Sequence, residues 1–277
     1  MSNALRQRIS RLPNYVRAFG PGTGLRLAFA IEKDLPRTAD APRPIAVPPY
    51  GNVWLRECVS DHAIFFQCLV RRQYDFSQMA HWPRVKARYD AMVAAGRTPL
   101  IVDCGGNVGL SSLWFAHTFP KARIVVVEPD QRNFAVLTKN LSPVAARVRP
   151  VNGGVWGHSG VLHITNPDAG FASFTLAEPE PGVAPPANAI RAYSVEDLMR
   201  EGQADEIFIA KVDIEGAQQV LFAENTGWVA KTDVLMIELD DWRLPWQGNS
   251  TSFFKCVSAL PFDYVLDGET VFCFRHT

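Results

Sequence analysis

The sequence lacks long apolar runs and carries no net charge. No stretch approaches the roughly 18 consecutive apolar residues that a membrane-spanning helix needs, and its first residues lack the apolar core of a signal peptide. Lysine and arginine number 28, and aspartate and glutamate also number 28, so the overall charge gives no reason to expect a nucleic-acid partner. We therefore expect a soluble, cytoplasmic protein.

Cysteine is scarce, and internal repeats and low-complexity tracts are absent. The five cysteines are widely spaced and form no C-x-x-C pair, which argues against a disulfide framework and against a zinc site. We expect reduced and mostly buried thiols instead. With 277 residues, 47% of them hydrophobic, the chain is long enough to bury one large core.

The first 50 residues differ in composition from the rest. Residues 1–43 contain eight basic and three acidic residues, and apolar residues recur there on one helical face until Pro13 interrupts the pattern. Five prolines between residues 36 and 49 indicate a linker. We interpret residues 1–50 as a basic helical extension packed on the body and followed by this linker, although such a segment could also contact an anionic membrane.

The remaining residues, 51–277, are predicted to form one α/β domain. Its lead-in, residues 51–97, begins with a strand at 51–58 and continues with a helix that Ser60 or Asp61 would cap and that runs to about Tyr74. Strands and helices then alternate, and the chain closes with two strands joined at an Asp-Gly turn. This order predicts a doubly wound, mostly parallel seven-stranded sheet with an antiparallel C-terminal hairpin.

A glycine-rich loop follows the first strand of the alternating region. That strand ends at Asp103, and we expect Gly105 and Gly106 to let a ligand approach the backbone, while Gly109 lets the next helix pack closely. The second strand ends at Glu128, 19 residues after Gly109. An acid at this spacing can reach the two hydroxyls of a ribose, so the pattern indicates a nucleoside-containing ligand.

The residues around the loop favour S-adenosylmethionine over a dinucleotide. The spacing is D-x-G-x-N-x-G, with Asn107 between the glycines, rather than the G-x-G-x-x-G of pyrophosphate sites. An acid at the strand end would repel a pyrophosphate, yet it suits the ammonium group of S-adenosylmethionine, which has no phosphate. An NAD(P)-dependent oxidoreductase is the alternative, and a tight turn without any ligand is another.

Four stretches, VDCGGNVG, VEPDQRNFAVLTKN, KVDIEGAQ and MIEL, resemble the FkbM-type methyltransferases, a branch of the class I S-adenosylmethionine-dependent O-methyltransferases. The lead-in stretch WLRECVSDHAIFFQCLVRRQYD is similar as well, and the resemblance covers roughly residues 50–240. It implies methyl transfer to a hydroxyl of a small-molecule or glycan acceptor, such as a sugar or a polyketide-type secondary metabolite. It also implies that the methionine end of the cofactor is held by Asp103, Gly105, Asn107 and Gly109, the ribose by Glu128 and the adenine amine by Asn152.

The sequence departs from the FkbM-type pattern at two places. VNGGVWG, which contains Asn152, lacks the alanine expected there, so the assignment of the adenine contact is looser. Gln218 stands where family members commonly have glutamate. We expect Gln218 to lie on a helix and to contribute little to catalysis.

The K-V-D-I-E-G motif places three candidate catalytic residues, Lys211, Asp213 and Glu215, at the end of the fourth strand. Methyl transfer to an alcohol requires an aligned displacement and removal of the hydroxyl proton. We predict Asp213 as the base or as the group that positions the acceptor, with Lys211 orienting it or offsetting its charge. These acids and those near Asp240 could bind a divalent cation, which we do not favour because strand-end acids also cap helices.

Other side chains are weaker candidates for the acceptor site. Among the six histidines, His62 in the lead-in helix is the one expected to reach the site. The aromatic residues Trp156, Phe171, Phe174 and Trp242 could line an acceptor pocket or belong to the core. A further alternative is a non-catalytic adapter that keeps the methyltransferase fold and uses the basic N-terminal residues as its interaction surface.

Overall fold

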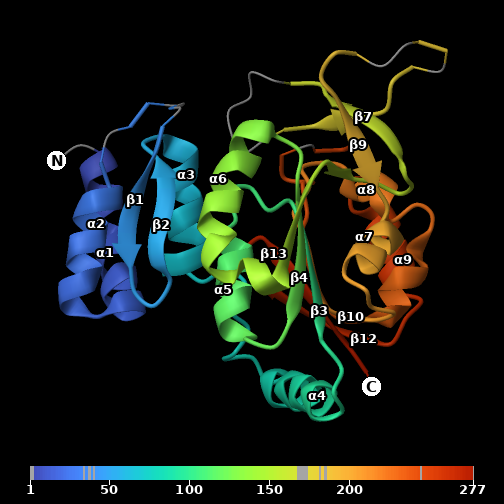
Figure 1. The fold of residues 1–277 in the computed structure, drawn as a ribbon, viewed down its shortest axis with the longest axis horizontal. Helices are drawn as coiled ribbons and strands as arrows, with labels where there is room; N and C mark the ends of the chain where they lie inside the picture. Colours follow the sequence, from blue (N-terminus) through green and yellow to red (C-terminus); the bar gives the residue numbers. More distant parts are fainter. Residues whose placement is uncertain are drawn as a thin grey trace.

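A seven-stranded sheet forms the centre of the computed structural model, which describes residues 3–33, 35–36, 39, 41–166, 174–180, 182–183, 186–243 and 245–276 (Figure 1). The strand order is β12-β13-β11-β10-β3-β4-β5. Neighbours from β11 to β5 are parallel, whereas β13 runs antiparallel to both β11 and β12. The predicted mostly parallel seven-stranded sheet is therefore confirmed. Its strands are β3 (Leu100–Cys104), β4 (Arg123–Glu128), β5 (Val148–Asn152), β10 (Ile207–Val212), β11 (Thr232–Glu238), β12 (Phe262–Asp267) and β13 (Thr270–Arg275).

Helices cover both faces of this sheet, which is why its inner strands are almost continuously apolar. Every residue of β3 and β10 is buried. Side chains alternate between two cores, so that Ile101 packs on one face and Val102 on the other. One face is covered by α4 (Trp82–Ala94), α5 (Leu110–Thr118) and α6 (Gln131–Leu141), and the other by α7 (Val195–Glu201), α8 (Gln218–Leu221) and α9 (Thr251–Val257).

The N-terminal residues form two helices, α1 (Asn3–Phe19) and α2 (Pro21–Ile31), that pack against the lead-in. The expected break at Pro13 is wrong, because α1 continues through it. Pro13 is exposed, so a backbone carbonyl left without its helical partner there can be hydrated. The first turn of α2 begins at Pro21, where the missing N–H has no cost.

The predicted linker is also wrong in part, because it contains a strand. Strand β1 (Pro42–Val47) pairs antiparallel with β2 (Gly51–Arg56) over six residue pairs. Pro42 and Pro44 are tolerated because β1 lies at the edge of a two-stranded sheet. The hairpin therefore crosses residue 50, where we predicted the boundary between the N-terminal extension and the α/β domain.

The lead-in helix is shorter and begins earlier than expected. It consists of α3 (Val59–Phe65) and a π-helical turn η1 (Phe66–Val70), and Cys58 occupies the N-cap position of α3. Asp61 does not cap it, because its carboxylate instead accepts hydrogen bonds from the backbone and side chain of Arg56. Ser60 lies within the first turn of α3.

A smaller sheet with the order β6-β9-β7-β8 lies beside the carboxyl end of β5. Asp130 caps α6, and Ser194 caps α7 in a capping box with Asp197. Phe171 lies outside the described residues. The remaining elements are β6 (Gly154–Val155), β7 (Gly160–Ile164), β8 (Leu176–Ala177), β9 (Ala189–Tyr193), η2 (Ser142–Arg147) and η3 (Thr226–Lys231).

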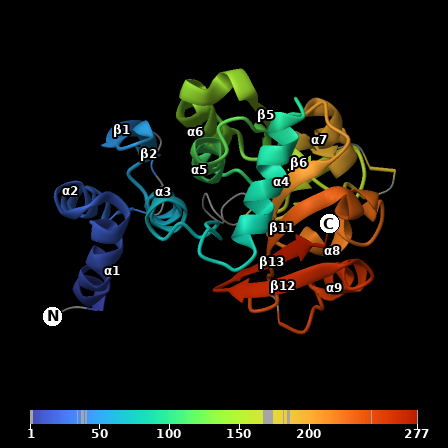
Figure 2. The same ribbon diagram turned by 90° about the horizontal axis from the view of Figure 1, so that it is seen from below.

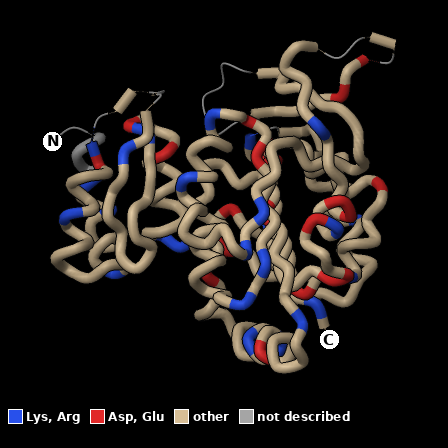
Figure 3. The backbone as a smooth tube through the Cα atoms, in the orientation of Figure 1, with Lys and Arg blue, Asp and Glu red and all other residues tan. Residues whose placement is uncertain are grey.

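Three features of the sequence can be followed in the structure: its apolar runs, its cysteines and its charges. Of the helices in the described part of the chain, none combines the length and apolar character needed to cross a membrane. The five cysteines are free thiols, and four of them are buried. Charges of both signs are dispersed over the molecule, as Figure 3 shows.

Candidate active site

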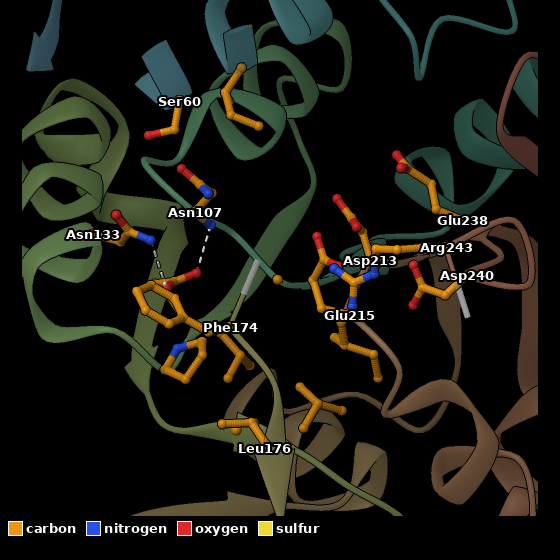
Figure 4. A pocket seen from close by; sticks show the side chains of 18 of the residues that line it. Ser60, Asn107, Asn133, Phe174, Leu176, Asp213, Glu215, Glu238, Asp240 and Arg243 are labelled. Carbon is orange, nitrogen blue, oxygen red and sulfur yellow. Dashed lines mark hydrogen bonds and ion pairs between the residues drawn. The ribbon is translucent and has the colours of Figure 1, made fainter. Parts of the chain in front are cut away.

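A cavity of about 280 Å³ lies beyond the carboxyl ends of β3, β4, β10 and β11. This is the edge of an open α/β sheet where ligands usually bind. The lead-in helix α3 closes one side of the cavity, and the loop after β11 closes another. Five of the ten predicted site residues line it, as Figure 4 shows in part: Gly105, Asn107, Glu128, Asp213 and Glu215.

The glycines of the loop are required by contacts within the protein. Gly105 has φ +86°, and a Cβ there would lie 1.8 Å from the backbone oxygen of Asp213. A Cβ on Gly106 would lie 2.3 Å from a methyl group of Val126. Close approach of neighbouring chain segments therefore requires these glycines, and the approach of a ligand to them remains a prediction. Gly109, with φ +85°, is the N-cap of α5, and a Cβ there would lie 3.2–3.3 Å from Leu137 and Leu141 of α6.

Asp103 and Lys211 lie beneath the cavity and do not line it. The Asp103 carboxylate is completely buried and accepts hydrogen bonds from Ser111 and Ser112, both at 2.6 Å. It is thus already bonded within the protein, whereas the sequence interpretation placed it against the methionine end of a cofactor. Strand pairing sets Lys211 beside Asp103, with Lys211 Nζ 3.3 Å from Asp103 Oδ1.

The Lys211 ammonium supports the loop and a carboxylate of the cavity wall together. It donates a 2.6 Å hydrogen bond to the Gly105 carbonyl and lies 3.4 Å from Asp213 Oδ2. Burial alone would lower the pKa of Lys211, but the negative charges of Asp103 and Asp213 outweigh it and raise that pKa. Lys211 is therefore a fixed positive charge behind Asp213, and its catalytic role remains a prediction.

Glu128 is held at the cavity wall by three donors. Its carboxylate accepts hydrogen bonds from Asn107 N at 2.8 Å, Asp130 N at 3.0 Å and Asn133 Nδ2 at 3.2 Å, and the first and last of these are drawn in Figure 4. Burial nevertheless raises the pKa of Glu128 to about 8. A neighbour that donates hydrogen bonds, such as a pair of hydroxyls, would favour the ionised form.

Asn152 lies near this wall but does not line the cavity. Its side-chain amide donates to the backbone oxygens of Glu128 and Pro129. In this arrangement Asn152 fixes the turn after β4, and the adenine contact assigned to it remains a prediction.

Asp213 and Glu238 form a pair of carboxyl groups linked by a tyrosine from the lead-in. Tyr74 Oη lies 3.0 Å from Glu238 Oε1 and 3.4 Å from Asp213 Oδ2. Burial and then the charge of Asp213 raise the pKa of Glu238 to about 8. At neutral pH Glu238 is therefore mostly protonated, while the positive charge of Lys211 faces Asp213.

Glu215 and Asp240 have partners of their own. Arg243, from the loop after β11, forms an ion pair with Glu215. Burial and then the charge of Asp213 raise the pKa of Glu215 to about 7. Asp240 accepts hydrogen bonds from Gly216 N and from Gln218 Nε2 at the start of α8, which is the helix-end role that we gave as the alternative to metal binding.

Metal coordination finds no support in these contacts. Within the described ranges, no group of three or more histidine, cysteine, aspartate or glutamate side chains has an arrangement that could hold a metal ion. The carboxylates nearest the cavity are instead bonded to Lys211, Arg243 and Tyr74.

Sequence reasoning missed Tyr74 and Arg243 and misplaced His62. Tyr74 was visible as a polar aromatic residue at the end of the lead-in stretch, and Arg243 as a base following two acids, but neither has a motif of its own. His62 is buried, and its Nδ1 lies 2.8 Å from the Ile31 carbonyl oxygen. Its ring is therefore directed toward the end of α2.

The aromatic candidates divide between the cavity and the core. Phe174 and Trp242 line the cavity, which is one of the two positions that the sequence left open for them. Trp156 is instead buried in the core on the face of the sheet that α7, α8 and α9 cover. Ser60 and Gln67, from the lead-in, line the cavity although they were not predicted to do so.

Comparisons with known proteins give partial matches. No protein-family model matches the chain. "Methyltransferase sdnD" of Sordaria araneosa is 35% identical over 69 residues, which are 24% of this chain and 27% of that protein. "2-O-methyltransferase NoeI" of Sinorhizobium fredii is 24% identical over 162 residues, which are 53% of this chain and 65% of that protein. The chain thus spans about a quarter and just under two thirds of these two relatives.

Among solved structures, similarity is weaker. Monomeric WbdD matches with a TM-score of 0.41 and 14% identity, covering 76% of this chain and 43% of that one. A putative O-methyltransferase from Klebsiella pneumoniae matches with a TM-score of 0.39 and 13% identity, covering 68% and 78%. The two curated relatives, together with the sheet order, support a class I methyltransferase, and membership of the FkbM type remains a prediction.

Proposed function

We propose that this chain is an S-adenosylmethionine-dependent O-methyltransferase that acts on a hydroxyl of a sugar or secondary metabolite. The main support is the charge of the cavity. Six carboxyl groups line it, from Glu128, Asp213, Glu215, Glu238, Asp240 and Glu269, against one guanidinium, from Arg243. Burial raises the pKa of three of them, Glu128, Glu215 and Glu238, and a ligand with a sulfonium and an ammonium group would favour their ionised form.

The same wall disfavours the NAD(P)-dependent alternative. A pyrophosphate site needs exposed backbone N–H groups at a helix N-terminus and a tolerance for negative charge. Here the N–H groups of Gly105 and Gly106 donate to the Val127 carbonyl, and Asn107 N donates to Glu128. Three donors of the glycine loop are therefore already used within the protein.

The residues present fit the proposed cofactor in two respects. Glu128 would accept hydrogen bonds from the ribose hydroxyls, since its carboxylate lies at the cavity wall and its three donors fix its orientation. Gly105 and Asp213, on the opposite side of the loop, would face the amino-acid end. Bound there, S-adenosylmethionine supplies an electrophilic methyl group.

Asp213 is the residue that we propose removes the acceptor proton. Its side chain is 26% exposed, which leaves it open to the cavity, and Lys211 lies behind it. Glu238 is less suited because its pKa of about 8 keeps it protonated at neutral pH. The Tyr74 hydroxyl lies within hydrogen-bond distance of both carboxyl groups and would donate to whichever of them is ionised.

The acceptor class rests on the chemistry of the cavity wall and on one relative. A hydroxyl acceptor needs a proton acceptor beside the methyl donor, and Asp213 meets this need. One similar protein is named a 2-O-methyltransferase, which agrees with oxygen as the acceptor atom.

Calorimetry with S-adenosylhomocysteine and with NAD(P)H tests the cofactor, and a screen of hydroxylated acceptors with labelled methyl donor tests the reaction. We expect S-adenosylhomocysteine to bind and NAD(P)H not to bind. With an accepted substrate, Asp213→Asn should lower kcat about 10²–10⁴-fold and leave S-adenosylhomocysteine affinity nearly unchanged.

The matched control is Asp90→Asn, which changes an exposed aspartate on α4 that pairs with Lys86. It should leave both quantities unchanged. Tight NAD(P)H binding without S-adenosylhomocysteine binding would refute the proposal. Full function of Asp213→Asn in the cell would favour the adapter alternative.

A further inference from the structure

A second, larger hollow of about 1070 Å³ adjoins the candidate active site. It lies between α1, the lead-in residues 63–78 and the turn that joins β12 to β13. Ala63, Gln67 and Glu269 line both this hollow, here called the acceptor groove, and the cavity. Figure 2 shows the β12–β13 hairpin extending toward the side of the molecule where α1 lies.

The acceptor groove is polar along most of its wall. Eleven of its sixteen lining residues carry charged or amide side chains, whereas pockets for compact drug-like ligands are mostly apolar. Arg17 and Arg71 offer hydrogen-bond donors, Asp267 and Glu269 offer acceptors, and Gln78 offers both. An apolar occupant would leave these groups without partners at a cost in free energy.

We propose that the acceptor groove binds the part of an oligosaccharide acceptor that extends beyond the sugar ring undergoing methylation. This inference rests on the proposed function and names its substrate class. Sugar hydroxyls both donate and accept hydrogen bonds, so they match a wall that mixes guanidinium, carboxylate and amide groups. The shared residues Ala63, Gln67 and Glu269 mark the point where the chain of sugars passes from the groove into the cavity.

Trp242 supplies the apolar surface that a sugar ring also needs. It lines the cavity, yet 69% of its surface is exposed. The faces of a pyranose ring carry C–H groups that pack on an indole, while the ring edge carries the hydroxyls. Trp246, in the same loop, is fully exposed but lines neither the cavity nor the acceptor groove.

The groove is shaped before any acceptor binds. The Arg11 guanidinium lies 4.4 Å from the centre of the Phe66 ring and donates to Glu32. Arg72, with φ +52°, donates to the Ala18 carbonyl and so joins the residues that follow η1 to α1. Left-handed backbone at a non-glycine residue costs free energy and is often found at functional sites.

The test uses the full chain loaded with S-adenosylhomocysteine. The probes are cello-, malto- and chito-oligosaccharides of one to four units, with catechol and caffeate as compact aromatic acceptors, and binding is measured by ligand-observed NMR titration. For at least one saccharide series, we expect affinity to rise tenfold or more between one and three units. Binding of catechol or caffeate with no rise along any series, or no saccharide binding at all, would overturn the inference.

Variants locate the gain in the acceptor groove. Ala18→Trp fills the groove from α1 and should abolish the gain with length, whereas Ala87→Trp, on the exposed face of α4, should preserve it. Should Ala18→Trp not fold, Arg17→Ala removes an exposed donor from the groove and should reduce the gain, with Arg149→Ala as its control. An unchanged gain in the folded groove variant would overturn the assignment.

The aromatic contact and the cofactor are tested separately. Trp242→Ala should weaken saccharide binding several-fold, and Trp246→Ala should not. S-adenosylhomocysteine binding by the groove variants should equal that of the unchanged protein. Failure of saccharide binding with S-adenosylhomocysteine bound sinks only this inference, whereas failure of S-adenosylhomocysteine to bind sinks the proposed function.

Discussion

Asp213 and Glu238 illustrate how neighbouring residues of one chemical type acquire different roles. Both lie at strand ends and both contact the Tyr74 hydroxyl. Only Asp213 has an ammonium group close behind it, that of Lys211. Glu238 is largely buried and bears the repulsion of Asp213, which raises its pKa to about 8. Glu238 is therefore the carboxyl group of the pair whose protonated form burial and repulsion favour.

The raised pKa of Glu238 predicts a pH-dependent stability. Between the ordinary value of 4.5 and about 8, the folded state keeps a proton that the unfolded state has lost. The Glu238 contribution is therefore most favourable below pH 4.5 and is lost as the pH rises through 8. Glu238→Gln has no such titration. Relative to the unchanged protein, its free energy of unfolding should therefore rise by up to a few kcal/mol between about pH 5 and 8.5.

Urea denaturation of both proteins at several pH values measures this difference. Glu201→Gln, an exposed residue on α7, serves as control and should give a curve parallel to that of the unchanged protein. If the Glu238→Gln curve is also parallel, the carboxyl group is ionised in the folded state and the distinction from Asp213 fails.

At the scale of elements, the loop between β3 and α5 is fixed by its neighbours. Gly105→Ala combines a left-handed φ with a Cβ placed 1.8 Å from the Asp213 oxygen. Gly96, after α4, has φ +72°, and a Cβ added there would meet no atom within 4 Å. Gly96→Ala should therefore cost about 1–2 kcal/mol, from the backbone conformation alone, and Gly105→Ala should cost more.

Chemical denaturation of the two alanine variants gives this comparison directly. The excess loss in Gly105→Ala measures the clash with the end of β10, and S-adenosylhomocysteine affinity should fall with it because the loop must move. Equal losses in the two variants would show that β10 yields freely, and that the loop is not held by this contact.

Elements were predictable where the sequence pattern is local. The strands of the large sheet are short apolar runs bounded by turns, and the caps at Asp130 and Ser194 carry their own signatures. Strand β1 was missed because its stability comes from pairing with β2, which five nearby prolines obscured. A strand that depends on its partner is not visible from its own residues.

The site was predictable to the same extent. Gly105, Asn107, Glu128, Asp213 and Glu215 belong to strand-end motifs, and the sheet brings them to one cavity. The roles of Tyr74 and Arg243 depend on how the lead-in and the loop after β11 fold back over that edge. The burial of Asp103 beneath the cavity was not predictable from its motif, because the depth of a strand-end residue depends on the helix packed above it.

At the scale of the whole molecule, a buried chain of hydrogen bonds joins the lead-in to Glu128, the proposed ribose-binding residue. Arg56 and Asp61 form an ion pair with exposures of 1% and 0%. Arg56 Nη2 also donates to Asn133 Oδ1 at 2.6 Å, and Asn133 Nδ2 donates to Glu128 Oε1. The orientation of Glu128 thus depends on a residue of β2, outside the large sheet.

This hydrogen-bond chain predicts that stability and ligand affinity respond differently to substitution. Arg56→Met leaves the Asp61 carboxylate buried without its cation and should cost about 3–5 kcal/mol, whereas Arg56→Met with Asp61→Leu should recover most of that loss. In both variants Asn133 loses the donor that orients its amide, so S-adenosylhomocysteine affinity should fall several-fold. Urea denaturation and calorimetry measure the two effects. If the double variant regains full affinity along with stability, Arg56 acts through the fold alone and does not position Glu128.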